Sequence, residues 1–310
     1  MTPGMNLYLW TDRLQPSHRG LLEQLSQLGY GSLEVPVLHH QDEAAYGSAA
    51  AWFDEVGLTR STAAALGPAV NPASPEASVR AAALESLTRM IGCTAALGAR
   101  RLVGPLHSSL GVFSGLPPTV DEWQWSVDTV RTAGERALAV GVELAIEPLN
   151  RFECYLLNDQ RRGAEYVRAV GLPNVGLLYD TFHAHIEEKD PAAALADVYG
   201  ELLHVHASEN DRSTPGQGQV RWHETLSVLK SRGWDGVLMV EAFGMSLPAL
   251  AAATRIWRPM FESPEQLARD AVQFLRGAWE AASDGRDRSG VRQPRQPRQA
   301  RQTRKPSKPR

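Results

Sequence analysis

The sequence predicts an α/β protein that folds as a single (β/α)8 TIM barrel. Short apolar runs of β type alternate with longer amphipathic stretches over about 280 residues, which gives eight strand-plus-helix units. The strand-like runs of the second half are apolar throughout, as in parallel strands that are buried on both faces. An open doubly wound sheet is the alternative, but no run is followed by the GxGxxG turn of its dinucleotide-binding members.

The first four units are expected in the first half of the chain. An Ala-rich stretch and a run with spaced Ala, Leu and Met positions give its clearest helices, and a loop rich in Pro, Gly and Asn precedes the second of them. The strands are expected at Asn6–Trp10, Ser32–Val37, Thr59–Ala64 and Arg101–Leu106. The helices are expected near His18–Leu28 and at Asp42–Val56, Glu76–Leu97 and Val120–Val140.

The pattern is sharper in the second half, where apolar runs and helical patterns follow each other without long gaps. The strands are expected at Val142–Leu149, Val175–Asp180, Leu202–His206 and Val237–Phe243. The helices are expected at Gln160–Val170, Pro191–Val198, Trp222–Arg232 and Pro264–Ala282.

The composition changes abruptly after Ser283 to Arg, Gln, Pro and Lys, which cannot build a core. We therefore expect the barrel over residues 1–283 and a disordered tail over residues 284–310. From Gly285 onward there are ten basic residues and one acid, which leaves 22 basic and 34 acidic residues in the rest of the chain. The acidic body argues against nucleic-acid binding by the folded part, and only weak contact through the basic tail is expected.

Cys93 and Cys154 are the only cysteines, too few for a disulfide framework. No run of 18 apolar residues exists, and no charged segment precedes an apolar stretch at the N-terminus. These features predict a cytoplasmic protein that does not contact membranes. They are compatible with a homo-oligomer.

Potential metal ligands end four consecutive strands of the second half. They are Glu147, Asp180, His206 and Glu241. One such residue alone is more typical of a helix cap, an ion pair or a core histidine. Because the carboxyl ends of barrel strands face one common site, four together predict a shared cation, without which the buried charges would be costly. Three carboxylates and one imidazole suit Mn²⁺, Mg²⁺ or Co²⁺, which can polarise a carbonyl and stabilise an enediolate.

Four segments resemble the D-tagatose 3-epimerase/D-psicose (allulose) 3-epimerase group of the xylose isomerase-like barrels. They are Glu147-Pro-Leu-Asn-Arg-Phe-Glu153, Asp180-Thr-Phe-His183 with Ile186-Glu-Glu188, His206-x5-Arg212-x2-Pro215-Gly216-x-Gly218, and Val240-Glu241-Ala-Phe243. In the first half, Leu33-Glu34-Val35 and Gly104-Pro-Leu-His107-Ser108 also resemble the group. The similarity spans residues 5–282.

The resemblance implies an isomerase of carbohydrate metabolism that inverts C3 of a free ketose through a cis-enediolate. It implies one divalent metal ion, with Mn²⁺ favoured over Co²⁺ and Mg²⁺, on the four strand-end residues. Glu147 and Glu241 would also be the acid/base pair, one on each face of C3. The residues implied in substrate binding are Glu153, His183, Arg212, His107, Trp10 and Phe243.

Three alternatives stay open. Hydroxypyruvate isomerases and inosose-handling enzymes use the same kind of site for another reaction. An endonuclease IV-like DNA-repair enzyme is less favoured, because it needs several zinc ions with more histidine ligands and a surface that accepts DNA. A non-catalytic binding module is disfavoured because all four candidate ligands are present.

Overall fold

Eight parallel strands close into a barrel in which each strand pairs with its neighbour in the sequence and the last pairs with the first. The computed structural model describes residues 1–38 and 42–284. The strands are β1 (Thr2–Asn6), β2 (Ser32–Pro36), β3 (Thr59–Ala63), β4 (Arg101–Gly104), β5 (Glu143–Ile146), β6 (Val175–Asp180), β7 (Leu202–Ala207) and β8 (Val237–Val240). The predicted TIM barrel is thus confirmed. The predicted tail lies, apart from Asp284, outside the described residues.

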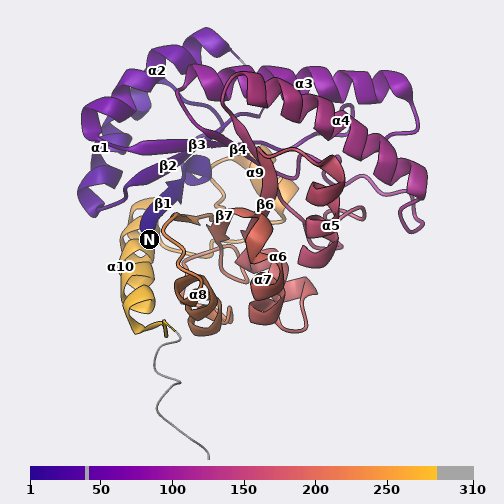
Figure 1. Cartoon of the computed structure of the whole chain (residues 1–310). Coiled ribbons are helices and arrows are strands. Elements are labelled where there is room, and N and C mark those ends of the chain that lie inside the picture. Colours follow the sequence, from indigo (N-terminus) through magenta and orange to yellow (C-terminus); the bar gives the residue numbers. More distant parts are fainter. Residues whose placement is uncertain (39–41, 285–310) are drawn as a thin grey trace, which may run out of the picture.

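Helices surround the barrel, and the last one packs beside β1, near the N-terminus (Figure 1). The α-helices are α1 (Arg19–Leu28), α2 (Glu43–Val56), α3 (Ala77–Ala96), α4 (Val120–Ala139), α5 (Gln160–Val170), α6 (Thr181–Glu187), α7 (Pro191–Val198), α8 (Trp222–Ser231), α9 (Pro248–Thr254) and α10 (Pro264–Ala281). The 3-10 turns are η1 (Leu7–Leu9), η2 (Pro16–His18) and η3 (Tyr199–Glu201).

Most predicted elements are found within a few residues of their expected bounds, but the first strand is displaced. The expected strand Asn6–Trp10 is wrong, because β1 ends at Asn6 and the chain turns directly into η1. The Asn6 side chain caps this turn by accepting a hydrogen bond from the Tyr8 amide at 2.8 Å. Two short helices, α6 and α9, were not predicted, and both lie at the carboxyl end of the barrel strands they follow.

The apolar core has two parts. The larger cluster joins the strands to the surrounding helices. The smaller one contains one side chain from each of β3, β4, β5 and β6, together with residues from η1 and the segment after β8. Its buried members are Tyr8, Ala63, Val103, Ala145, Leu178, Phe243, Ala251 and Ile256. Three of these eight residues are alanines, and Tyr8, Ala63 and Phe243 also line a cavity.

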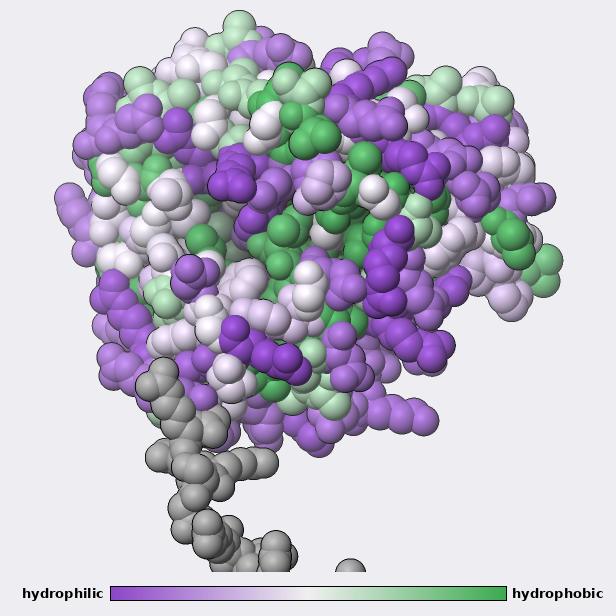
Figure 2. Space-filling view, viewed as in Figure 1, coloured by the Kyte–Doolittle hydropathy of each residue, from purple (hydrophilic) through white to green (hydrophobic). Residues whose placement is uncertain are grey.

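The surface in the view of Figure 1 carries small groups of hydrophobic residues among hydrophilic ones (Figure 2). Within residues 1–38 and 42–284, no helix is long and apolar enough to cross a membrane.

Candidate active site at the carboxyl end of the barrel

The four strand-end side chains meet at one point inside the carboxyl end of the barrel. Glu147 follows β5, Asp180 ends β6, His206 lies in β7 and Glu241 follows β8. One potential ligand atom from each lies within 4.8 Å of all the others. Because Asp180 and His206 are register partners on adjacent strands, the parallel pairing itself brings them together. All four are buried, and Glu241, the most exposed, shows only 7% of its surface.

His206 Nδ1 lies at the centre of this cluster. It is 3.4 Å from Glu241 Oε1, 3.6 Å from Asp180 Oδ2 and 3.9 Å from Glu147 Oε1. Among the described residues, neither His206 Nδ1 nor Asp180 Oδ2 has a hydrogen-bond partner. Buried polar atoms without partners are costly, so three converging carboxylates and a free imidazole nitrogen fit a divalent cation that prefers oxygen and nitrogen ligands.

The two oxygens of Asp180 have separate tasks. Oδ1 caps α6 by accepting hydrogen bonds from the amides of Phe182, at 2.6 Å, and His183, at 3.2 Å. Oδ2 faces the cluster. The same cap starts the helix that carries His183. Asp180 thus takes part in the candidate metal site and also holds the start of the helix that places a candidate substrate contact.

Burial dominates the electrostatics of the two glutamates. It raises the pKa of Glu241 to about 8 and the pKa of Glu147 well above its usual value, although His206 acts in the opposite direction on both. Burial would lower the pKa of His206, but Glu241 and Glu34 raise it well above its usual value. Burial acts to raise the pKa of Asp180 too, yet it lies below the usual value, with the contact with His206 as the largest opposing influence.

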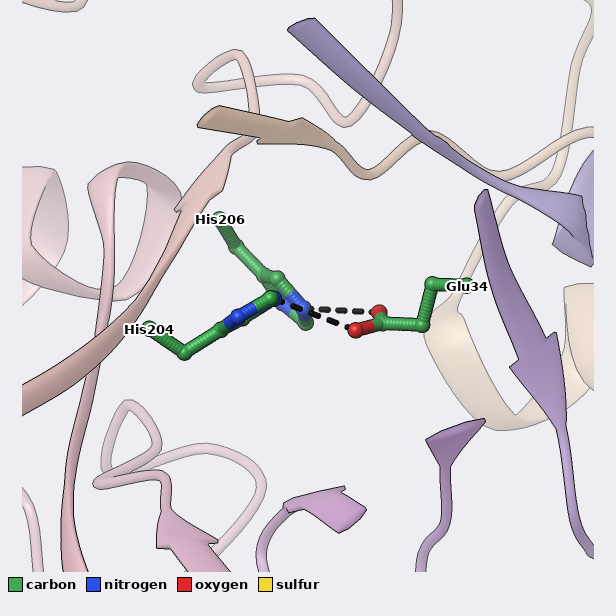
Figure 3. Close-up of side chains that lie close together, drawn as sticks. All are labelled: Glu34, His204 and His206. Atoms are coloured by element: carbon green, nitrogen blue, oxygen red, sulfur yellow. Dashed lines mark hydrogen bonds and ion pairs between the residues drawn. The ribbon is translucent and has the colours of Figure 1, made fainter. Parts of the chain in front are cut away.

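Glu34 is a buried carboxylate on β2 to which the sequence reasoning gave no role. Figure 3 shows it facing two imidazoles of β7, His204 and His206. Glu34 Oε1 lies 2.9 Å from His206 Nε2, and Oε2 lies 3.1 Å from His204 Nε2. The signal was available, since Glu34 is a charged residue between apolar neighbours within a predicted buried strand.

His183 presents a hydrogen-bond donor to the cavity. Its Nδ1 accepts a hydrogen bond from the Asn150 amide at 2.9 Å, and an amide can only donate, so the neutral ring carries its proton on Nε2. Burial lowers the pKa of His183 to about 4, which keeps the ring neutral at pH 7. Nε2 lies 3.6 Å from Glu147 Oε1 and lines the cavity above the cluster.

Arg212 is the cation of the cavity. Its Nη2 donates to Glu153 Oε1 at 2.7 Å, and Asn150 donates to the same oxygen at 2.9 Å. The guanidinium lies over the rings of Phe182 and Phe243, at 4.1 and 4.9 Å from their centroids. Its backbone adopts a left-handed conformation, with φ of 61°. Such conformations are strained for residues other than glycine and persist where the surroundings hold them in place.

Four of the six residues expected at the substrate line this cavity, and two do not. Glu153, His183, Arg212 and Phe243 are among its lining residues, together with Tyr8, Leu110 and Leu250. Trp10 is absent from the lining, because β1 ends early and η1 brings Tyr8 to that side instead, where it stacks on Phe243 at 5.4 Å between centroids. The Trp10 indole donates instead to Glu265.

His107 lies behind the cavity wall rather than in it. Its Nε2–H donates to the backbone carbonyl of Glu147 at 3.1 Å, and its Nδ1 accepts from Ser108. Gly104 allows this part of the wall to approach closely, since its φ is 126° and a Cβ there would lie 2.1 Å from the Ala64 carbonyl oxygen. His107 therefore supports Glu147 and does not contact the cavity.

Known proteins share both the sequence pattern and the fold. Residues 22–278 match the family described as xylose isomerase-like TIM barrel. A probable ketose 3-epimerase of Synechocystis sp. is 27% identical, with 89% of this chain and 96% of that protein covered. A D-psicose 3-epimerase of Agrobacterium fabrum is 28% identical, with 89% and 98% covered. A solved L-ribulose 3-epimerase is 27% identical and superimposes with a TM-score of 0.87, covering 95% of this chain and 99% of that one.

Proposed function

The chain belongs to the xylose isomerase-like TIM barrel family, and from this premise we propose that it is a divalent-metal-dependent ketose 3-epimerase. Its relatives named as ketose, D-psicose and L-ribulose 3-epimerases are covered almost end to end. The single observation that carries the proposal is the convergence of Glu147, Asp180, His206 and Glu241 inside 4.8 Å, at a cavity that all but Asp180 line.

The four clustered residues are proposed to hold one Mn²⁺ ion, with Co²⁺ and Mg²⁺ as alternatives. When bound, such an ion polarises a carbonyl and stabilises the negative charge that develops on neighbouring oxygens. Three carboxylates and one imidazole favour a divalent ion that prefers oxygen and nitrogen ligands over an ion that prefers thiolates.

Glu147 and Glu241 are proposed as the acid/base pair. They follow β5 and β8, two strands that are not neighbours in the barrel, so their carboxylates enter the cluster from separate positions on its wall. Inversion at C3 requires one carboxylate to take the proton and another to return a proton on the opposite face, through a cis-enediolate. Burial raises the pKa of both groups, that of Glu241 to about 8, so each carboxyl group holds a proton more readily than an exposed one.

His183, Arg212 and Glu153 are proposed to orient the sugar. The His183 Nε2–H can donate to a sugar oxygen beside the carbonyl, and the Arg212–Glu153 pair offers a donor and an acceptor to hydroxyl groups at the same end of the cavity. Tyr8 and Phe243 give an apolar wall on which the C–H groups of a sugar ring or chain can pack. No Gly-rich phosphate cradle follows a predicted strand, which favours a free sugar over a phosphorylated one.

The test is a panel of free ketohexoses and ketopentoses incubated with the Mn²⁺-loaded protein in D₂O. The proposal expects C3 epimers by chromatography and deuterium at C3 by NMR. Deuterium at C3 appears only if the protein removes the C3 proton and delivers a solvent-derived deuteron in its place. Isomerisation of hydroxypyruvate without any ketose epimerisation would instead favour the alternative reaction on the same site. The cytoplasmic location and self-association remain predictions.

A further inference from the structure

We propose that Glu34 is a positioning residue that fixes the orientation and tautomer of His206 and so prepares the metal site. The inference rests on the proposed function, because it assumes that His206 is a metal ligand. Glu34 lies on β2, across the barrel from His206 on β7, and 172 residues separate the two in the sequence. Figure 3 shows the carboxylate directed at the two imidazoles.

The carboxylate of Glu34 is held in place by two hydrogen bonds besides its contacts with the histidines. Asn6 donates to Oε1 and Ser61 donates to Oε2, both at 2.8 Å. The strand register explains these contacts, since Asn6, Glu34 and Ser61 are register partners on β1, β2 and β3. Glu34 has no exposed surface. A buried carboxylate is tolerated only when its oxygens are satisfied, so these two donors fix its place.

The contact with His206 determines which ring nitrogen carries the proton. A carboxylate oxygen accepts hydrogen bonds, so His206 Nε2 must be the donor in the 2.9 Å contact with Oε1. Nδ1 is then the nitrogen left to give up its proton and to direct a lone pair at a metal held by Glu147, Asp180 and Glu241. A metal-ligating histidine needs such a partner on its other nitrogen, because the partner fixes the ring orientation and raises the basicity of the ligand.

The same three residues, Glu34, His204 and His206, could in principle hold an ion of their own, since their ligand atoms also lie within 4.8 Å. The contacts favour hydrogen bonding instead. An ion there would need a lone pair on His206 Nε2, while Nδ1 also needs a lone pair to bind the ion of the other cluster. The ring would then have to lose both of its N–H protons. In addition, both oxygens of Glu34 already accept hydrogen bonds from Asn6 and Ser61.

The experiment measures Mn²⁺ binding to the metal-free protein by titration calorimetry, with the melting temperature of the metal-free protein as a separate readout. The variant is Glu34→Gln, which keeps the shape and removes the charge. Loss of a partner behind a metal ligand weakens metal affinity by about 10–100-fold, and we expect a shift of this size. Mn²⁺ raised above the new dissociation constant should restore the thermal stabilisation by metal, because the ligands themselves are intact.

Ser61→Ala is the matched control. It removes a buried hydrogen bond to Oε2 of the same carboxylate but leaves the contact between Oε1 and His206. A structural role alone would lower the melting temperature and leave affinity unchanged in both variants. We expect Ser61→Ala to bind Mn²⁺ nearly as tightly as the unmodified chain.

Four outcomes would count against the inference or its premise. Unchanged affinity in Glu34→Gln overturns the inference, and so does an equal loss of affinity in Ser61→Ala. Two ions per chain, one of them lost in Glu34→Gln, would assign the group to a second metal. An unmodified chain that binds no Mn²⁺, Co²⁺ or Mg²⁺ would overturn the proposed function instead. If Glu34→Gln does not fold, Glu34→Asp keeps the charge but is too short to reach His206, and unchanged affinity in it is equally decisive.

Discussion

Asp180 offers a sharp separation of metal binding from folding, because its two oxygens do different work. In Asp180→Asn, the remaining amide oxygen can still cap α6 by accepting from the amides of Phe182 and His183. The amide nitrogen replaces Oδ2, which lies 3.6 Å from His206 Nδ1. A donor in that place cannot bind a cation. In Asp180→Ala, both the cap and the candidate ligand are lost.

The expected magnitudes follow from these contacts. The metal-free Asn variant keeps the cap but loses the attraction between Asp180 and His206 that lowers the pKa of Asp180, so it should be somewhat less stable than the unmodified chain. The metal-free Ala variant should be less stable than the Asn variant by about 1 kcal/mol, the usual cost of a lost N-cap. Mn²⁺ at 100 times its dissociation constant should stabilise the unmodified chain by about 2.7 kcal/mol and neither variant.

Urea unfolding of the three proteins, each with EDTA and with Mn²⁺, measures all of these differences. An Asn variant that gains as much stability from Mn²⁺ as the unmodified chain would remove Asp180 from the ligand set. Equal metal-free stabilities of the Asn and Ala variants would show that the cap on α6 contributes nothing. Each result refutes a different part of the reasoning.

Three further predictions concern catalysis, pH and the tail. Glu147→Gln and Glu241→Gln should each lower kcat by about 10²–10⁴-fold with unchanged circular dichroism, since each removes one partner of the acid/base pair; near-normal turnover in either would exclude that role. The metal-free protein should lose stability as the pH rises from the usual carboxyl range towards 8, because folded Glu241, with its pKa raised to about 8, retains a proton that the unfolded chain releases. The melting temperature in EDTA, measured in buffers from about pH 5 to about pH 9 that span this window, tests the prediction. A melting temperature that increases with pH would contradict it. Removal of residues 285–310 should leave kcat unchanged, since α10 ends at Ala281 and every described cavity residue precedes it; a large loss would show that the tail assists assembly or closure.

The sequence alone was enough to predict the barrel and the four strand-end residues. Parallel strands buried on both faces need continuous apolar runs, and the charged residue at each run's end therefore stands out. The order β5 to β8 then places Glu147, Asp180, His206 and Glu241 on one side of one barrel end. These positions can be predicted from the sequence because the end of each apolar run marks the end of a strand.

The tertiary structure alone decided which side chains complete the site. Tyr8 replaces Trp10 at the cavity because Asn6 caps a turn that no apolar pattern predicts. The partnership of Glu34 with His206 depends on closure of the barrel, which brings β2 and β7 to face each other across its interior. A contact between residues so far apart in the sequence leaves no periodic trace, so the charge of Glu34 was visible in the sequence while its partner was not.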